Sequence, residues 1–408
     1  MPEATTRRTR IWRNHDFRLI WAAQSLSSLG TGMSQLAYPL LMLSITGSPA
    51  QAGALAAVRA LPYAIFGLPA GALNDRWPRR RVMIVCDSIR AVALLSVPFA
   101  LWTHHLHPVQ LYVVGFIAGT AYVFFSAAET GALPNVVAAD DLTAAVSAQE
   151  VSASASGTVA PPIGGVLFGL FHGLPFLVDA ASFLGSAAAL SRVRARFESS
   201  QHATPERHWS SAAVAGLVWL WRHPVLRPVA LTAAALQVAI SGVVLLVIVG
   251  ARAAGASATA IGILLAAAGV GGVIGASTAT WVRKTLGFAT TLIAVAAIQT
   301  VLWVLFAVSP TEWVTGAGLV LFAATMPIFG VAVLSYQMAQ TPDELRGRVG
   351  TAFGLMTWGA TPIGAAAAGL LLDHLSVTST ALVFAAWTAA VAAGSAGTFT
   401  EVEANGRN

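Results

Sequence analysis

The chain has 408 residues, of which 56% are hydrophobic and only 10% are charged. An ordinary soluble domain has roughly 25% charged residues, so this composition excludes a soluble globular protein and indicates a membrane protein. Cys86 is the single cysteine, which excludes a disulfide within the chain and a cysteine metal cluster. The basic residues outside the apolar runs are split among separate loops and are not gathered with stacking aromatic residues, so we expect no nucleic-acid partner.

Twelve apolar runs are long enough to cross a bilayer, which takes about 20 helical residues. They lie at 17–45, 50–73, 82–102, 108–130, 147–171, 174–196, 225–250, 258–281, 288–308, 312–339, 349–371 and 377–400. The runs are continuously apolar and do not alternate with polar residues, so they indicate helices and not a β-barrel. We therefore predict an all-α membrane protein with twelve transmembrane helices.

The basic residues fall on one side of the predicted bilayer. If the runs cross in succession, the basic groups of residues 7–18, 76–81, 192–227, 283–284, 346–348 and 407 share one side, and only Arg252 lies opposite. Because Lys and Arg favour cytoplasmic loops, the sequence predicts an inner-membrane protein with both termini in the cytoplasm.

The two parts of the chain resemble each other. APPIGGVLFGL at 160–170 matches ATPIGAAAAGL at 360–370, and GALNDRWPR at 71–79 shares four residues with GASTATWVR at 275–283. The longest polar stretch, 192–211, separates six runs from six. We predict two pseudo-symmetric six-helix halves, 1–196 and 225–408, joined by a cytoplasmic linker at 197–224. Such repeats are typical of transporters that rock two halves around a central site.

The loop GALNDRWPRRR resembles the signature G-x-x-x-D-R-x-G-R-R of the major facilitator superfamily. Its matching residues are Gly71, Asp75, Arg76, Arg79 and Arg80. The resemblance extends over essentially the whole chain and implies that Asp75 caps the eleventh span from the facing half, where a helix dipole stabilises a carboxylate. The loop would then act as a gate; the alternative is that its charges only fix the topology.

Finer features resemble the branch of this superfamily that contains the enterobactin exporter and macrolide efflux proteins, among them NHDFRLIWAAQSLSSLG and FLVDAASFL. APPIGGVL also resembles the G-P-x-x-G-G motif of export-directed antiporters. Proline and small residues at these positions predict a helix that bends and packs closely. The residues are Pro161, Pro162, Gly164 and Gly165, with Pro362 and Gly364 in the second half. The family's usual arginine in the fourth span is absent, which puts its proton-coupling scheme in doubt.

Ionisable residues inside spans cost at least about 2.5 kcal/mol each at the centre and are functional candidates. Those at depth all lie in the first half: Arg59, Asp87, Arg90, Glu129, Glu150 and Asp179. Asp87 and Arg90 are three residues apart and are expected to form a structural ion pair, while Arg59 and Asp179, at similar depth, are expected to be able to pair across helices.

Glu150 is the first candidate for a proton carrier, because it has no evident cationic partner and burial would allow reversible protonation. The alternative is that it is solvated at the cytoplasmic mouth. Asp179 is the next candidate on the same physical grounds.

Polar and aromatic residues at mid-depth are candidates for the substrate cavity. The resemblance points to spans one, four, seven and ten, which supply Gln35, Tyr38, Tyr122, Phe125, Gln237, Phe329 and Tyr336. A few polar groups among aromatic ones suit an amphipathic organic molecule, whereas multiply anionic substrates need paired cations that are absent.

Of two further stretches, one has two alternative interpretations and the other is not expected to form a metal site. GLVWLWRHPVLRPV is either a surface helix, with Trp219 and Trp221 at the interface and Arg222 and His223 in water, or an early start of span seven. The histidines of HHLH at 104–107 are expected to be solvated loop residues, so we expect no metal and no cofactor.

The sequence therefore predicts a secondary transporter that exports an amphipathic organic compound, such as a drug, siderophore or secondary metabolite, in exchange for protons by alternating access. Uptake by symport and facilitated diffusion are the alternatives within transport, and a transport-dead sensor or scaffold is the alternative in a different class. No nucleotide-binding loop and no catalytic constellation is present, so we predict that it is not an enzyme. We expect a monomer in the lipid bilayer.

Overall fold

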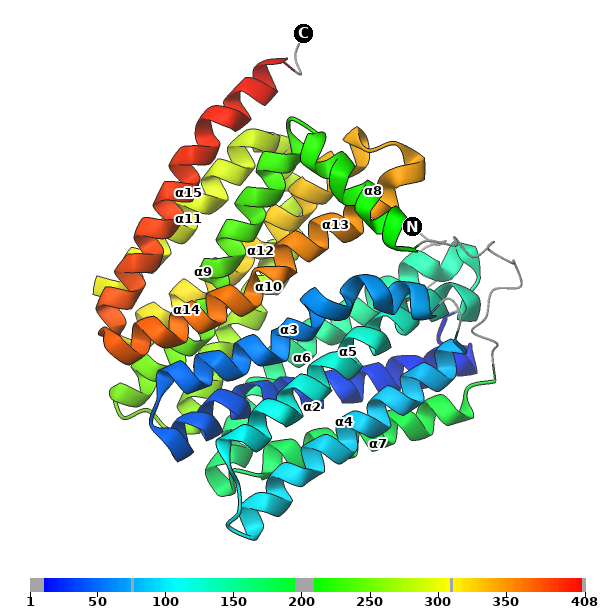
Figure 1. Cartoon of the computed structure of the whole chain (residues 1–408), viewed down its shortest axis with the longest axis vertical. Coiled ribbons are helices and arrows are strands. Elements are labelled where there is room, and N and C mark those ends of the chain that lie inside the picture. The colour runs from blue at the N-terminus through cyan, green and yellow to red at the C-terminus, as the bar shows by residue number, and fades with distance from the viewer. Residues whose placement is uncertain (1–10, 75–76, 195–208, 309–310, 406–408) are drawn as a thin grey trace.

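The computed structural model describes residues 11–74, 77–194, 209–308 and 311–405 (Figure 1). These residues form helices joined by short turns. The first group comprises α2 (His15–Thr46), α3 (Pro49–Asn74), α4 (Arg79–Trp102), α5 (Pro108–Val136), α6 (Leu142–Leu170) and α7 (Leu174–Arg192). The second comprises α9 (Leu226–Ala253), α10 (Ala258–Leu286), α11 (Phe288–Val308), α12 (Glu312–Gln340), α13 (Arg346–Gly359), α14 (Thr361–His374) and α15 (Val377–Asn405), while α8 (Trp209–Arg222) lies between the groups.

Eleven helical segments of the described chain are long and apolar enough to cross a membrane. They cover every predicted span except the first. That span falls within α2, which has 32 residues and, at about 1.5 Å per residue, is long enough to cross, but serine, threonine and glutamine residues make it less apolar. The multi-pass helical fold is thus confirmed, and the twelfth span stays a prediction.

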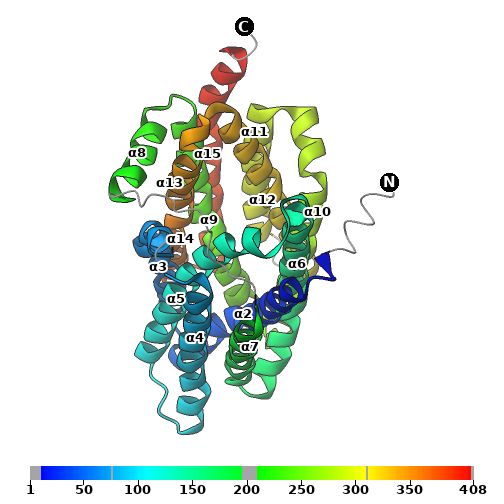
Figure 2. The same cartoon turned by 90° about the vertical axis from the view of Figure 1, so that its right-hand side faces the viewer.

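The two groups of helices meet along two seams. In both views α3 lies beside α14 and α6 lies beside α10 (Figures 1 and 2). Each seam is close-packed at glycine: a Cβ on Gly53 would collide with the Ala365 carbonyl, and a Cβ on Gly165 would collide with the Ala258 carbonyl. The small residues of the APPIGGVL and ATPIGAAAAGL segments therefore bring backbones into contact across the two groups, as expected for helices that associate in lipid.

The same contact also recurs within each group. A Cβ on Gly164 would lie 2.9 Å from the backbone of Met33 in α2, and a Cβ on Gly364 would collide with the backbone of Val238 in α9. The predicted close packing of this motif is confirmed in both copies.

The prolines of the two copies have different effects. Pro161 and Pro162 lie inside α6, which continues unbroken to Leu170. The predicted eleventh span is instead divided, because α13 ends at Gly359 and α14 begins at Thr361 with Pro362 in its first turn. Proline lacks the N–H that would continue the helical ladder, so a break at Pro362 is physically expected, whereas α6 is not interrupted at Pro161 and Pro162.

The segment before α9 is a separate helix. Trp209–Arg222 forms α8 within the predicted linker, and its Gly216 lies against the backbone of Arg348 in α13. Trp221 is 51% exposed and α8 ends before α9 begins, so the early start of span seven is wrong, while the position of α8 at a membrane interface stays a prediction. His223 is not simply in water: its ring lies tilted against that of Trp219, with ring centroids 4.9 Å apart, and its Nδ1 accepts a hydrogen bond from the N–H of Leu226 at 3.1 Å.

His223 predicts a pH dependence of stability. Burial lowers its pKa below the ordinary value, so the neutral, capping form stabilises the fold above about pH 6.5, the ordinary pKa, and this contribution is lost as the pH falls through the folded pKa. Replacing His223 by Ala should cost about 1 kcal/mol at pH 8, the typical value of a helix cap, and should weaken the acid-induced fall in melting temperature. Thermal unfolding in detergent at pH 8 and pH 5.5 measures both effects, and an equal acid-induced fall in both proteins would contradict the assignment.

Candidate functional site

Asp179 of α7 lies inside the bundle with its carboxylate held by serine hydroxyls. It is 2% exposed. The Ser34 hydroxyl of α2 donates to its Oδ2 at 2.5 Å, and the Ser182 hydroxyl lies 3.4 Å from its Oδ1. The approach of α2 to α7 requires a glycine here, because a Cβ on Gly30 would lie 2.7 Å from Asp179 Oδ1. The carboxylate therefore links two helices through a hydrogen bond in an apolar interior.

Arg90 lies between the two buried aspartates. Its Nη1 is 3.7 Å from Asp87 Oδ1, its Nη2 donates to Thr31 of α2 at 3.2 Å, and its guanidinium lies 3.6 Å above the Phe183 ring. Arg90 and Asp87 are 6% and 0% exposed. Asp87 and Arg90 are thus neighbours, as their spacing on α4 predicts, and their role as a structural ion pair stays a prediction.

Arg59 does not form the predicted pair with Asp179. Within the described chain no ion pair joins them, and the Arg59 guanidinium lies 4.0 Å from the centre of the Tyr38 ring. The Arg59 stem is fixed against α5, where a Cβ on Gly115 would lie 2.6 Å from its Cγ. A cation over an aromatic face replaces the expected ion pair, while the serines occupy the oxygens of Asp179.

The other two carboxylates of this half lie further toward the first residues of α6. Glu129 of α5 is partly buried and accepts a hydrogen bond from Gln149 Nε2 at 3.3 Å. Glu150 is exposed, as the solvated alternative predicted. The burial on which its role as proton carrier depended is absent, so its coupling role stays a prediction with Asp179 the better-placed acid.

The predicted cavity residues divide into buried and exposed groups. Tyr38 and Phe125 are 2% and 3% exposed and belong to the packing of the first group of helices. Gln237 donates to Thr361 at 3.1 Å, while Phe329 is half-buried and Tyr336 stacks on Phe288 with centroids 4.1 Å apart. Gln35 is exposed, and Tyr122 is 53% exposed. In this conformation Gln35 and Tyr122 are the accessible candidates for a substrate wall, and Tyr38 and Phe125 are not.

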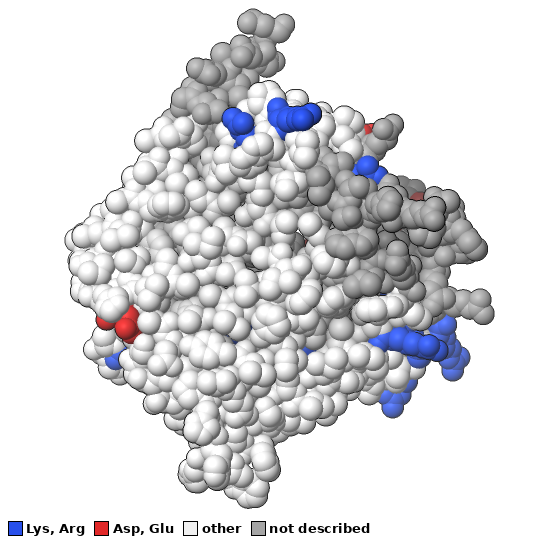
Figure 3. All heavy atoms as spheres, in the orientation of Figure 1, with Lys and Arg blue, Asp and Glu red and all other residues white. Residues whose placement is uncertain are grey.

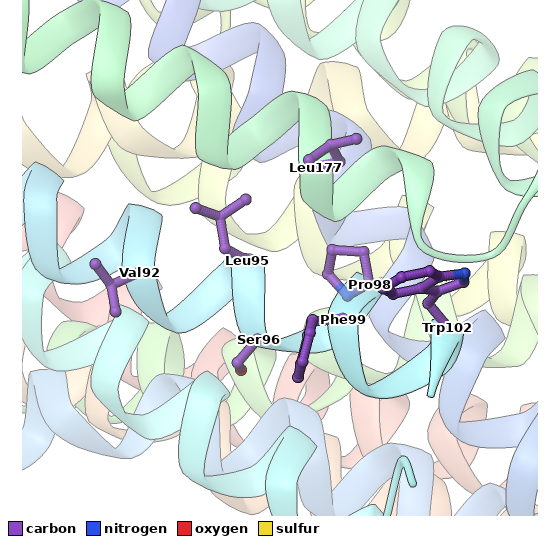
Figure 4. A pocket seen from close by; sticks show the side chains of 7 residues that line it. All are labelled: Val92, Leu95, Ser96, Pro98, Phe99, Trp102 and Leu177. Carbon is purple, nitrogen blue, oxygen red and sulfur yellow. The ribbon is translucent and has the colours of Figure 1, made fainter. Parts of the chain in front are cut away.

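A hollow of about 520 Å³ lies elsewhere, between α4 and α7 (Figure 4). Its walls include Phe99, Trp102 and Leu177, and no ionisable side chain lines it. Walls that are apolar except for Ser96 suit lipid chains better than a polar ligand, so this hollow is distinct from the buried cluster.

The signature loop is attached to its own group of helices. Arg79 donates to the Gly131 carbonyl of α5 at 2.6 Å, and Arg80 donates to the Leu190 carbonyl of α7 at 2.9 Å and to that of Ser191. Gly71 lies in the last turns of α3. Asp75 and Arg76 lie outside the described residues, so the predicted cap on the eleventh span stays a prediction. What the geometry adds is that Arg79 and Arg80 stabilise the ends of α5 and α7.

Polar contacts between the two groups occur at the side opposite to this loop. Asp373 of α14 accepts the Ser48 hydroxyl at 2.8 Å and the N–H of Ala50 at 3.2 Å, which caps the start of α3. Arg252 of α9 donates to the Leu40 carbonyl of α2 at 3.3 Å. The exposed basic side chains gather at the other side (Figure 3). Among the described residues, the two groups are therefore joined by hydrogen bonds at the side where Arg252 lies.

Sequence reasoning missed these partners. Ser34 and Tyr38 are one turn apart on α2, and Ser182 follows Asp179 by one turn, so the local spacing was visible. Nothing in the sequence shows that α2 meets α7 at this height or that Asp373 reaches α3.

A family model described as a transmembrane secretion effector matches residues 10–406. The chain belongs to this family, a branch of the major facilitator superfamily. It is 30% identical over 382 residues to the multidrug efflux pump Tap of Mycolicibacterium fortuitum, covering 89% of this chain and 91% of that protein. It is 28% identical over 156 residues to macrolide efflux protein A of Streptococcus pyogenes, which is 38% of each chain.

A solved transporter structure has a similar fold. A crystal structure of the nucleoside transporter NupG, as its D323A mutant, superposes with a TM-score of 0.78 at 14% identity and covers 93% of this chain and all of that one. At this identity the likeness shows the fold alone. The predicted resemblance to the superfamily, including its macrolide efflux branch, is confirmed.

The bonds of Arg80 predict a local loss of stability. Replacing Arg80 by Ala leaves the last carbonyls of α7 without their charged donor and should lower the free energy of unfolding by about 1.5 kcal/mol, the low end for hydrogen bonds to charged groups. Arg81→Ala is the matched control, because it removes the same charge from the same loop at an exposed residue. Denaturation in detergent measures both, and equal losses would show that only loop charge matters.

The contacts of Asp373 predict how its replacement changes the separation of the two groups of helices. Asp373→Ala removes the cap from α3 and should increase the separation of the two groups at this side, whereas Asp373→Asn keeps a capping oxygen and should change it less. Spin labels on the exposed residues His107 and Thr378, in a Cys86→Ala background, report the distance distribution. Identical distributions for the Ala variant and the parent would contradict a role in closure.

Proposed function

We propose that this protein is a secondary transporter that exports an amphipathic organic compound, such as a drug, siderophore or secondary metabolite, in exchange for protons. The observation that carries the proposal is the buried carboxylate of Asp179, held between α2 and α7 by Ser34 and Ser182. An ionisable group is costly inside a membrane and marks a functional site by default. In a transporter fold without a nucleotide-binding loop, reversible protonation of such a group is the available energy source.

Export of an amphipathic compound is supported by the relatives. The chain aligns over about nine tenths of its length with a protein named a multidrug efflux pump, and over a shorter part with one named for macrolide efflux. Macrolides are large amphipathic molecules, and the accessible candidates Gln35 and Tyr122 combine an amide with an aromatic ring. A site of this kind orients an apolar compound by a few polar contacts.

The proposal includes twelve spans in two halves. We take α2 as the first span because it packs along α6 and α7 over its length, and we take α13 with α14 as the eleventh. The basic side is then cytoplasmic by the positive-inside rule, with both termini there. The hydrogen bonds of Asp373 and Arg252 would close the periplasmic side, so the structure would represent the inward-open state of an alternating-access cycle.

Protonation of Asp179 would change the contact between α2 and α7. The ionised carboxylate accepts hydrogen bonds from two hydroxyls, whereas the protonated acid is itself a donor and needs a rearranged partner. Proton binding would therefore alter the packing of α2, which also carries Gln35 and reaches Arg252 of the other half through Leu40. This connection is a physical route from proton to helix movement.

The alternatives give different results in one assay. Purified protein in vesicles that contain a pH-sensitive dye is exposed to erythromycin, a macrolide, or to ethidium, and flux is followed with the proton signal. The wild type should couple flux to proton movement, and Asp179→Asn should reduce the proton signal at least tenfold. Glu150→Gln, a change at an exposed carboxylate, is the matched control and should leave it near the wild-type level.

Each of the other possible results would contradict one part of the proposal. Flux without a proton signal would leave facilitated diffusion, and compound movement together with protons in the same direction would indicate uptake by symport. Binding without flux for either compound would favour a sensor. A proton signal that survives Asp179→Asn would place the carrier elsewhere in the chain.

A further inference from the structure

Asp87 of α4 is a buried carboxylate that the proposed mechanism does not use. It is 0% exposed, and neither of its carboxylate oxygens has a hydrogen-bond partner. Its one ionic contact is to Arg90, at 3.7 Å, which is too long for a hydrogen bond. An ionised carboxylate in a dry interior is strongly disfavoured unless it is both paired and hydrogen-bonded, and Asp87 lacks the hydrogen bonds.

Arg90 is engaged elsewhere. Its Nη2 donates to Thr31 of α2, and the plane of the guanidinium lies against Phe183 of α7. Its Nε is buried and without a partner. The guanidinium is therefore drawn away from Asp87 toward the side where Ser34 and Asp179 lie, one turn further along α2 and opposite on α7.

The groups around Asp87 agree with a neutral acid. From α7 it is faced by the hydroxyl of Ser186, from α5 by Glu129, and α4 itself supplies Arg90, around which Asp179 and Tyr122 also lie. Two of these groups are further carboxylates and one is a cation. With Asp87 protonated, Arg90 and the ionised Asp179 balance each other, and the carboxylic O–H of Asp87 has a free hydroxyl acceptor nearby in Ser186.

We propose that Asp87 is a second proton-binding site, occupied in this conformation, and that Arg90 moves from Thr31 and Phe183 onto Asp87 when the proton leaves. Protonation forms one O–H bond on the carboxylate and changes its charge from −1 to 0, with the proton transferred from a hydronium ion of the aqueous phase, which becomes water. Loss of the proton creates a buried anion whose Oδ1 lies 3.7 Å from Arg90 Nη1 without a hydrogen bond to it, and the attraction between the two charges draws the guanidinium closer. The move would loosen α4 from α2.

This inference extends the proposed proton coupling, since it gives the transporter two acids that share one arginine. It differs from the expectation of a structural ion pair, in which Asp87 would stay ionised. Infrared spectroscopy can distinguish a protonated Asp87 from an ionised Asp87, because a protonated carboxylic acid has a C=O stretch that a carboxylate lacks.

The experiment is infrared spectroscopy of the purified protein in dodecyl maltoside, a detergent without a carbonyl group. At about pH 6 the wild type should show the C=O band of a buried carboxylic acid whose proton exchanges slowly with solvent. Asp87→Asn should remove this band. Asp179→Asn and the exposed Asp373→Asn are the controls and should retain it. Raising the pH to about 9 should diminish the band in the wild type.

A second variant guards against loss of folding. Asp87→Glu keeps a carboxyl group and should shift the frequency of the band without abolishing it. Absence of a carboxylic acid band in folded wild type, or a band unaffected by both Asp87→Asn and Asp87→Glu, would overturn the proposal.

The outcome is independent of the vesicle assay. An Asp87 band in a protein that transports without proton movement would support the second site and reject the coupling. Proton movement without the band would support the coupling and reject the site.

Discussion

The ionisable side chains inside the bundle require partners that only neighbouring helices supply. Water is absent from a bilayer interior, so a charge there is stable only against hydroxyls, aromatic faces and opposite charges. Asp179 accepts a hydrogen bond from Ser34 of α2. Arg90 donates a hydrogen bond to Thr31 of α2 and lies over the Phe183 ring of α7, while Arg59 lies over the Tyr38 ring. These contacts determine how α2, α3, α4 and α7 pack. A change in the protonation of these side chains would therefore change the packing of these helices.

The second group of helices holds no comparable cluster among its described residues. Its contribution is geometric: Gly262 and Ala365 bring α10 and α14 into backbone contact with α6 and α3. Glycine at such seams removes the side chain that would otherwise keep backbones apart. The ionisable cluster thus lies in the first group of helices, and glycines allow close backbone contacts between that group and the second.

Several parts of the site were predictable from local spacing. Residues three apart on a helix face the same side, which placed Arg90 beside Asp87, and the glycine pattern predicted close packing at Gly164 and Gly364. Arg59 and Asp179 were expected to pair from depth alone, but depth does not fix rotation about the helix axis, and Tyr38 occupies the face of Arg59. The two copies of the proline motif also differ in outcome, since α6 runs through Pro161 and Pro162 whereas α13 and α14 are separate helices with Pro362 in the first turn of α14.

The sequence by itself determined the helical membrane fold, the separation of basic from non-basic sides and the family, because hydropathy, loop charge and short motifs are local properties. Only the tertiary structure decided which acids are buried and by what they are held. Glu150 and Asp87 differ in burial although both lie in predicted spans. Burial depends on which face of each helix meets another helix, and that is settled by the packing of segments far apart in the chain.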